Sequence, residues 1–498
     1  MAAPDRLEDA PTAPAARDQI PRIPSGIPGL DEITHGGLPA KRLTLVTGTS
    51  GAGKTVLSAQ YLAEGIRRGE PGVFVTFEER PERTRDNLRS LGVLIEEWEA
   101  EGKWRFVNAS PRFDEPHVVA GLFDLASLIL RVRTAVAETG AKRVAIDSVG
   151  ALITRFNEPG PARESLFQLG YHLEEAGATS VITAERVDDY GPISRLGFEE
   201  FLADNVIVLR NGLENEKRRR TIEVLKLRGG THQRGEHLFT VVGGTGVVVV
   251  PHEEIDFDYG TSTQRLPSGN PGLDEMLNGG FFDRSLILVT GPTGAGKSLV
   301  ATQFVGAGAA RGERSLLISF EESRAQLGRN AEAWGLDFAS MEREGSLRIL
   351  VSAPESASLE DHLMRMKRIL DDYRPDRVAI DSLTALQRIA TVKTFREYML
   401  GLTFHIKNSA LLGLMTAAGV DVLASGEPSD LHLSTSSDVI IGLHYVGFEG
   451  ALHRGVSVIK LRGSDHDKAL REFTITNTGM HVGEPFGRRL WGTTPQLF

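Results

Sequence analysis

Two glycine-rich segments carry residues that could hold the phosphates of a nucleotide. Gly48–Thr55 reads GTSGAGKT and Gly291–Ser298 reads GPTGAGKS. In the pattern G-x-x-x-x-G-K-[ST], backbone N–H groups converge on the phosphates, the lysine neutralises them and the last hydroxyl ligates Mg²⁺. Each segment follows an apolar run and opens a helical pattern, which favours two nucleotide sites over two glycine-rich turns with surface lysines.

Acidic residues that could complete these sites also occur twice. The hexapeptide RVAIDS, at Arg143–Ser148 and Arg377–Ser382, places Asp147 and Asp381 at the end of an apolar strand, where a carboxylate can hold Mg²⁺. The alternative for each aspartate is a cap after a buried strand.

Two pairs of glutamates are the candidate bases. Glu78-Glu79 and Glu321-Glu322 both follow apolar runs, and a carboxylate there can take a proton from an attacking water or hydroxyl. Adjacent residues of an extended chain point to opposite sides, so we expect one glutamate of each pair to face the phosphates. Surface charge at a strand end is the alternative.

A basic tetrapeptide, KLRG, is the third repeated motif. It occurs at Lys226–Gly229 and Lys460–Gly463, far in sequence from the glycine-rich loops. Its lysine and arginine share one face of a strand and could reach a phosphate bound on a neighbouring subunit, as arginine fingers do. A solvated edge strand explains the pattern equally well.

The spacing of the motifs shows that a whole domain is duplicated. The glycine-rich loop and the glutamate pair recur after 243 residues, and RVAIDS and KLRG recur after 234. Apolar runs of strand length alternate with helical patterns in each half, which predicts an α/β fold with two mostly parallel sheets flanked by helices. From composition we expect these divisions: a disordered tail 1–19, a first domain 20–251, a linker 252–264, a second domain 265–482 and a short tail 483–498.

Composition narrows the class of protein. The chain has 498 residues, a formal charge of −10 and no cysteine, which excludes disulfide frameworks, zinc ribbons, iron–sulfur ligation and cysteine nucleophiles. No apolar run approaches the roughly 18 residues of a membrane helix, and we see no signal peptide. We expect a cytoplasmic protein, and the acidic balance argues against a wide nucleic-acid surface.

With these motifs, the sequence resembles the KaiC family, the tandem RecA-like P-loop ATPases and autokinases of the bacterial circadian clock. The resemblance runs from about Pro24 to about Gly479. Its most specific strings are FEESRAQL at Phe320–Leu327, PESASLEDHL at Pro354–Leu363, HLSTSSDVI at His432–Ile440 and KLRGSDHDKALREF at Lys460–Phe473.

The resemblance implies a homohexamer of two stacked rings with ATP and Mg²⁺ between subunits. The first-domain ring would hydrolyse ATP, with Glu78 activating water and Glu79 beside it, and would recruit a KaiB-like protein. The second-domain ring would phosphorylate itself on Ser434 and Thr435, with Glu321 as the base and Glu322 beside it. An output histidine kinase is a possible further partner.

The same resemblance, together with the loops, assigns residues to the ligands. The ATP contacts of the first domain would be Gly48, Thr49, Ser50, Gly51, Ala52, Gly53, Lys54, Thr55, Val56, Ser90, Lys226, Leu227, Arg228 and His232. Those of the second would be Gly291, Pro292, Thr293, Gly294, Ala295, Gly296, Lys297, Ser298, Leu299, Trp334, Arg454, Lys460, Leu461, Arg462, Ser464 and Lys468. The metal ligands would be Thr55, Asp147, Ser298, Glu321 and Asp381.

The repeat itself bears on where phosphorylation occurs. A shift of 234 residues places Ser434 and Thr435 on Glu200 and Phe201, and Asp438 on Asp204. The first half therefore lacks hydroxyl acceptors at the matching site, which predicts phosphorylation in the second half alone. Without the family resemblance, STSS reads as a polar turn before a strand.

Departures from the cyanobacterial pattern shape the expected regulation. Ser429 stands where the cyanobacterial form has a threonine. Only a short segment follows Gly479, whereas cyanobacterial members continue into a longer tail that binds the activator KaiA, so we expect KaiA-independent phosphorylation. The alternatives are a DNA-dependent ATPase of the recombinase or helicase type and a nucleotide-gated scaffold without kinase activity. Whether the protein oscillates or acts as an hourglass timer is left open by the sequence.

Overall fold

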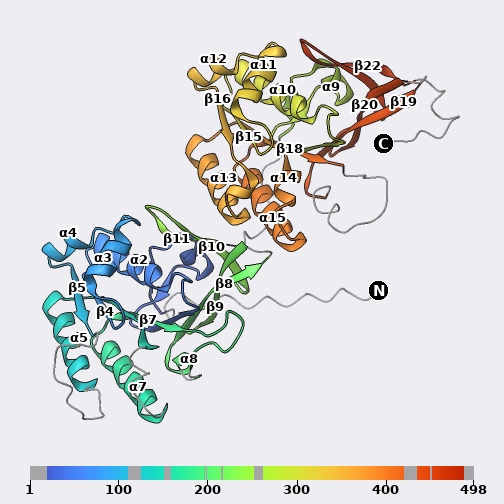
Figure 1. Cartoon of the computed structure of the whole chain (residues 1–498). Helices are drawn as coiled ribbons and strands as arrows, with labels where there is room; N and C mark the ends of the chain where they lie inside the picture. Colours follow the sequence, from blue (N-terminus) through green and yellow to red (C-terminus); the bar gives the residue numbers. More distant parts are fainter. Residues whose placement is uncertain are drawn as a thin grey trace, which may run out of the picture. The chain divides into compact units, whose positions relative to one another are not determined.

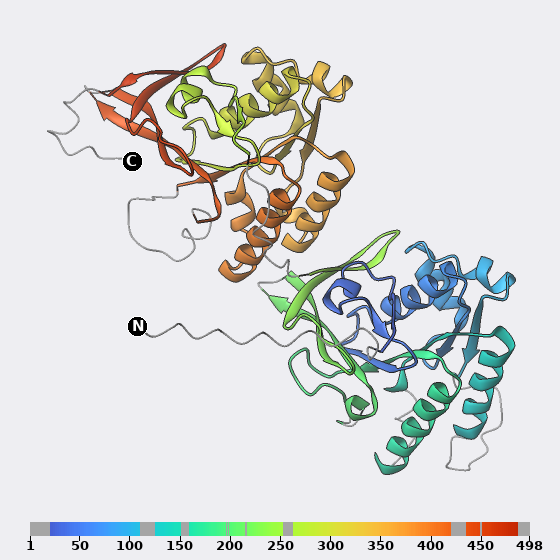
Figure 2. The ribbon, with the colours of Figure 1, turned by 180° about the vertical axis from the view of Figure 1, so that it is seen from behind.

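The computed structural model describes residues 20–109, 125–150, 159–195, 197, 199–214, 217–251, 262–419, 435–448 and 451–486. The chain divides into two compact units, Met1–His252 and Glu253–Phe498 (Figures 1 and 2). Each unit holds a nine-stranded sheet and a small two-stranded one. No helix in the described part of the chain is long and apolar enough to cross a membrane.

The sheet of the first unit is parallel on one side and antiparallel on the other. Its order is β11-β10-β9-β8-β3-β7-β6-β4-β5, in which β8, β3, β7, β6, β4 and β5 run parallel. The strands are β3 (Leu43–Gly48), β4 (Gly72–Thr76), β5 (Trp104–Asn108), β6 (Arg143–Asp147), β7 (Thr179–Glu185), β8 (Asn205–Glu214), β9 (Lys217–Leu227), β10 (Glu236–Val242) and β11 (Gly246–Val250). A small antiparallel pair, β1 (Arg22–Ile23) and β2 (Leu38–Pro39), stands beside it.

Both faces of this sheet are buried, which is why its central strands read as unbroken apolar runs. Successive residues face opposite sides, so Leu45 packs with the helices of one face and Val46 with those of the other. One face carries α5 (Leu125–Thr139), α7 (Pro159–Glu175) and α8 (Glu199–Leu202). The other carries α1 (Leu30–Ile33), α2 (Lys54–Arg67), α3 (Pro81–Arg89) and α4 (Ile95–Ala100).

The second unit repeats this plan strand for strand. Its order, β16-β15-β17-β18-β14-β19-β20-β21-β22, is that of the first sheet written from the other end. The strands are β14 (Leu286–Gly291), β15 (Ser315–Ser319), β16 (Leu347–Val351), β17 (Arg377–Asp381), β18 (Leu412–Ala418), β19 (Val439–Phe448), β20 (Ala451–Leu461), β21 (Arg471–Thr476) and β22 (Gly479–Pro485). The predicted fold class, two α/β domains with mostly parallel sheets, is confirmed.

The remaining elements of the second unit are a small antiparallel strand pair and a set of helices. The small pair is β12 (Arg265–Leu266) with β13 (Phe281–Phe282). The helices are α9 (Pro271–Met276), α10 (Lys297–Ala310), α11 (Arg324–Ala333), α12 (Phe338–Arg343), α13 (Leu359–Tyr373), α14 (Leu383–Gln387) and α15 (Val392–Asn408), with a 3₁₀ turn at Pro354–Ser356. Strand β22 continues to Pro485, three residues past the boundary expected at Val482, because it pairs with β21 as far as Arg471.

The arginine that opens RVAIDS is buried in both units, a role that the motif does not reveal. Arg143 has no exposed surface. Its Nε lies 2.8 Å from Glu70, and its Nη1 donates to the carbonyls of Pro24 and Tyr61 at 2.8 and 3.0 Å. Arg377 binds Glu313 and the Pro267 carbonyl in the same manner. Each arginine therefore ties the first residue of a central strand to the helix behind the phosphate loop.

Replacing Arg143 with alanine should lower the free energy of unfolding by about 3 kcal/mol, because two carbonyls and the partly exposed Glu70 carboxylate lose a fully buried donor. Urea unfolding of the full chain measures this change. Arg105→Ala is the matched control, since Arg105 pairs with Glu138 at 3.6 Å with both side chains more than half exposed and such pairs contribute at most about 1 kcal/mol. Equal losses in the two variants would contradict the assignment.

Candidate functional site

Each glycine-rich loop joins a central strand to a helix. The first lies between β3 and α2, the second between β14 and α10. The glycine before each helix, Gly53 and Gly296, has φ of 100° and 110°, a left-handed conformation that favours glycine. The loops therefore turn sharply and aim their N–H groups at the mouth of the site, as phosphate binding requires.

The lysine of each loop is folded back onto the loop itself. Lys54 Nζ donates to the carbonyls of Gly48 and Thr49 at 2.8 and 2.9 Å, and Lys297 Nζ donates to those of Gly291 and Pro292 at the same distances. Burial lowers the pKa of both lysines, while neighbouring carboxylates oppose the shift. An anionic phosphate placed here would restore the charge balance of a partly desolvated cation.

The two RVAIDS aspartates lie beside the hydroxyl that ends each loop, but they are satisfied differently. Asp147 accepts the Thr55 hydroxyl at 2.6 Å on one oxygen and the Thr183 hydroxyl on the other. Asp381 accepts the Thr416 hydroxyl on Oδ1, whereas its buried Oδ2 has no hydrogen bond of standard geometry. Burial raises the pKa of Asp381, and the nearby Ser298 hydroxyl and Lys297 ammonium oppose that rise.

These oxygens suit a magnesium ion that is shared with a nucleotide. Carboxylates and hydroxyls are the hard oxygen ligands that Mg²⁺ prefers, and Mg²⁺ in such sites takes one or two carboxylates plus phosphate oxygens. No group of three or more histidines or carboxylates in the described residues could hold a metal by itself. The buried Oδ2 of Asp381, beside the Ser298 hydroxyl, is an oxygen that fits such an ion.

The two glutamates of each pair have different partners. Glu78 accepts the Ser148 hydroxyl at 2.7 Å, and Glu321 accepts the Ser382 hydroxyl at 2.8 Å, so each is fixed beside the aspartate strand. Glu79 lies instead near Asn87, at 3.3 Å. Its counterpart Glu322 accepts from Asn330 at 2.9 Å, and burial raises the pKa of Glu322. The first glutamate of each pair therefore faces the loop lysine and the aspartate.

The basic residues of KLRG lie at the opposite edge of the sheet from the loops. Lys226 Nζ donates to the Ala203 carbonyl at 2.6 Å, and Lys460 Nζ donates to the Ser437 carbonyl at 2.7 Å. Arg228 lies 3.5 Å from Asp204, which is bonded to Leu43, the first residue of β3. The phosphate loop begins at the other end of β3. A strand of this length spans about 17 Å, so these residues cannot reach the phosphates of their own domain.

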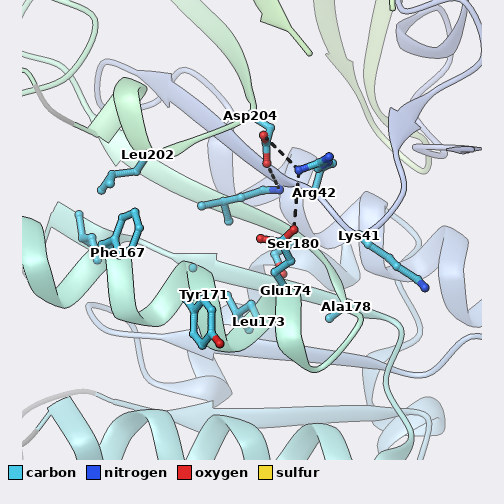
Figure 3. Close-up of a pocket in the computed structure, with 13 residues that line it drawn as sticks. Lys41, Arg42, Phe167, Tyr171, Leu173, Glu174, Ala178, Ser180, Leu202 and Asp204 are labelled. Atoms are coloured by element: carbon cyan, nitrogen blue, oxygen red, sulfur yellow. Dashed lines mark hydrogen bonds and ion pairs between the residues drawn. The ribbon is translucent and has the colours of Figure 1, made fainter. Parts of the chain in front are cut away.

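Asp204 and Asp438 occupy equivalent places, as the 234-residue register requires. The backbone N–H of Asp204 donates to the Leu43 carbonyl at 3.0 Å, and that of Asp438 to the Leu286 carbonyl at 2.8 Å. Each aspartate also meets two cations. Arg42 approaches Asp204 at 3.6 Å and bridges it to Glu174 (Figure 3).

In the second domain, Asp438 is also paired with two cations. Lys407 lies 3.4 Å from Asp438, and Arg462 approaches the same carboxylate at 3.3 Å. Arg462 Nη2 also donates to the Thr435 carbonyl at 2.7 Å, so Asp438 and Arg462 together hold the segment that carries Thr435. Ser434, the other predicted acceptor, lies outside the described residues, as does Ser429.

The other predicted contacts are scattered over each domain. Ser90 and Trp334 cap α3 and α11. Leu227 and Leu461 are buried in the core. Burial lowers the pKa of His232, and the Arg454 guanidinium lies 5.8 Å from the Tyr445 ring centre. Ser464 donates to the Asp465 carbonyl, and the exposed Lys468 pairs with Asp465. Of these eight residues, Arg454 is linked to the phosphate loop of its own chain through Tyr445, whose hydroxyl donates to the Thr293 carbonyl at 3.5 Å.

Sequence reasoning missed the hydroxyls that orient the acids. Ser148 and Ser382 close the RVAIDS motif and were visible as part of the repeat. Thr183 and Thr416 lie within apolar runs. They are 233 residues apart, one residue less than the repeat distance of RVAIDS, so the repeat offers little sign of them. Their role requires the strand order, in which β7 and β18 lie next to the aspartate strands.

Comparisons with known proteins agree with this geometry. The family model described as "ATPase: KaiC" matches residues 23–254 and 266–486. The circadian clock protein KaiC3 of Synechocystis sp. is 49% identical over 94% of this chain and 93% of its own length. The circadian clock oscillator proteins KaiC of Prochlorococcus marinus (strain MIT 9313) and Thermostichus vulcanus are 46% and 45% identical, over 94% and 96% of this chain and 94% and 92% of their own lengths. The resemblance drawn from the motifs is confirmed.

Asp381→Asn should stabilise the nucleotide-free protein and weaken Mg²⁺–ATP binding. A carboxyl whose pKa is raised by folding loses stability as the pH rises towards its folded pKa, so a neutral amide removes that cost at pH 7. A gain of about 1 kcal/mol would raise the melting temperature by about 2–4 °C. Calorimetry with and without Mg²⁺–ATP measures both effects. Asp147→Asn is the control, because both oxygens of Asp147 already accept hydrogen bonds, and an equal gain there would contradict the explanation.

Proposed function

The chain belongs to the KaiC ATPase family, and we propose that it is a clock or timer protein whose two domains use ATP differently. The first domain hydrolyses ATP, and the second transfers phosphate to Ser434 and Thr435 of the same protein. One observation carries this proposal. The two domains have equivalent nucleotide sites, but only the second has a hydroxyl that can accept phosphate, because the counterpart of Thr435 in the first domain is the exposed Phe201.

Both reactions use the same arrangement of groups. The loop N–H groups and lysine hold the phosphates. Thr55 with Asp147, or Ser298 with Asp381 and Glu321, would hold Mg²⁺, and the bound ion would neutralise the phosphates and orient them. Glu78 takes the proton of an attacking water. Glu321, in the equivalent place, takes the proton of the Ser434 or Thr435 hydroxyl, and ADP leaves in each case.

The position of the KLRG residues supports a ring assembly. Since Lys226, Arg228, Lys460 and Arg462 lie at the far edge of the sheet from their own loops, they can contact ATP only across a subunit boundary. A closed homohexamer, with each loop facing the KLRG edge of its neighbour, gives every site these cations. The same contact would bring the Thr435 segment, held by Arg462, to the neighbour's second-domain ATP.

We propose two partners from membership of the family. A KaiB-like protein would bind the first-domain ring, and an output histidine kinase would respond to the phosphorylation state. We propose that phosphorylation proceeds without KaiA and that the protein works in the cytoplasm, with no membrane and no nucleic acid among its partners.

Glu321→Gln should abolish autophosphorylation while leaving hydrolysis by the first domain largely intact, because only the second base is lost. Phosphate incorporation by intact-mass spectrometry and phosphate release by a continuous assay follow the two reactions. Glu78→Gln is the matched variant and should show the reverse pattern, with a loss of about 100-fold in hydrolysis. Loss of both activities in either variant would show that the domains do not divide the reactions.

Incubation of the purified protein with Mg²⁺–ATP should add phosphate to Ser434 and Thr435 without KaiA. Intact mass and peptide mapping over a day follow the modification, and Ser434→Ala with Thr435→Ala should remove it. An unmodified wild type would favour a nucleotide-gated scaffold. Phosphorylation only after KaiA is added would refute KaiA independence, and stimulation of hydrolysis by single-stranded DNA would favour a DNA-dependent ATPase.

A further inference from the structure

The two sites differ at the end of the strand between the phosphate loop and the aspartate. In the first domain this strand is β7, and its last residue, Glu185, pairs in register with Gly48, the first residue of the loop. In the second domain the matching strand β18 ends at Ala418, which pairs with Gly291. Two positions earlier the strands agree, since Thr183 and Thr416 both donate to the aspartate. The two strands therefore share the threonine but differ at their last residue, which carries a carboxylate only in the first domain.

Glu185 lies close to the lysine that holds the phosphates. The N–H of Arg186 donates to the Gly48 carbonyl at 3.1 Å, and Lys54 Nζ donates to that same carbonyl at 2.8 Å. Thr183 and Glu185 are two positions apart in β7, so the Glu185 side chain points to the face on which Thr183 meets Asp147. At the position that pairs with the first residue of the loop, the first site therefore has a carboxylate where the second site has Ala418.

The segment that follows β7 is fastened to the phosphate loop. Asp189 Oδ1 accepts the Thr49 hydroxyl at 2.8 Å and the Asn211 N–H at 3.0 Å. This link fixes the chain four residues beyond Glu185. The second loop has Pro292 in the place of Thr49 and so has no hydroxyl to donate at this position. Two separate substitutions thus set the first site apart at the same edge.

We propose that Glu185 is a further positioning residue of the first site, which holds Lys54 and orders the attacking water for hydrolysis. The inference rests on the proposed division of reactions between the domains. Ala418 offers no carboxylate at the matching position of the second site, which favours attack by a protein hydroxyl there.

The chemistry assigns the two carboxylates separate tasks. The water oxygen bonds to the γ-phosphorus, its proton passes to Glu78, the bond to the β–γ bridging oxygen breaks, and ADP leaves. Glu185 takes no proton in this sequence. It accepts a hydrogen bond from the water on the side away from Glu78, and it keeps Lys54 at the loop while the phosphates are held. Such orientation acts on the turnover rate more than on binding.

The first experiment compares Glu185→Gln with its parent, the full-length Glu321→Gln variant, in which the second site is silent. We expect kcat for hydrolysis to fall about tenfold, with KM for ATP changed less than about twofold. Val187→Ala, at a side chain 74% exposed two residues further on, is the control and should leave both values unchanged. An unchanged or raised kcat in Glu185→Gln, or a rise in KM alone, would overturn the proposal.

The second experiment transplants the carboxylate and does not depend on the first variant folding. Ala418→Glu in full-length Glu78→Gln, whose first site is silent, should raise the ratio of phosphate released to phosphate transferred at least threefold. An unchanged ratio would count against Glu185 as the source of the difference. A parental Glu78→Gln that still hydrolyses ATP fully would refute the proposed function itself, and the two failures are therefore distinguishable.

Discussion

The function of each domain depends on one constraint: neighbouring parallel strands end at the same edge of the sheet. Strand β3 delivers the phosphate loop to this edge, β6 delivers Asp147, and β4 leads into Glu78. The Ser148 hydroxyl then joins the aspartate strand to the glutamate. The strand order alone therefore brings the phosphate loop, the aspartate and the glutamate together.

The opposite edge of the same sheet holds the cations of the KLRG segments. Asp204 and Asp438 lie at this edge, where each binds the first residue of the loop-bearing strand and the arginine of its KLRG segment. The phosphate loop and these cations therefore lie at the two ends of one strand. Under the proposed function, assembly in a ring would bring the cations of one subunit to the phosphate loop of the next.

The motifs predicted the fold well, since repeated loops, strand-like runs and RVAIDS all depend on local pattern. They could not predict contacts between strands distant in sequence. The hydroxyl of Thr183 becomes meaningful only when β6 and β7 are known to be neighbours, and the carboxylate of Glu185 only when β7 is known to pair with β3. The ATP contacts matched through the KLRG segments stay a prediction from family resemblance, and their place at the far edge follows only from the antiparallel pairing of β8 with β9.

Two copies of one fold can come to catalyse different reactions through few substitutions, provided that these lie at the sheet edge where the nucleotide binds. The cores of the two domains keep the same strand order, and Glu78 and Glu321 each accept a hydrogen bond from the serine that ends RVAIDS. Under the proposed function, the domains would differ in the oxygen that stands opposite the γ-phosphate: water beside Glu185 in the first domain, or a hydroxyl near Thr435 in the second. Since the phosphate loop and the glutamate are common to both, the choice between hydrolysis and phosphorylation would then be a choice of nucleophile, made by residues outside the shared motifs.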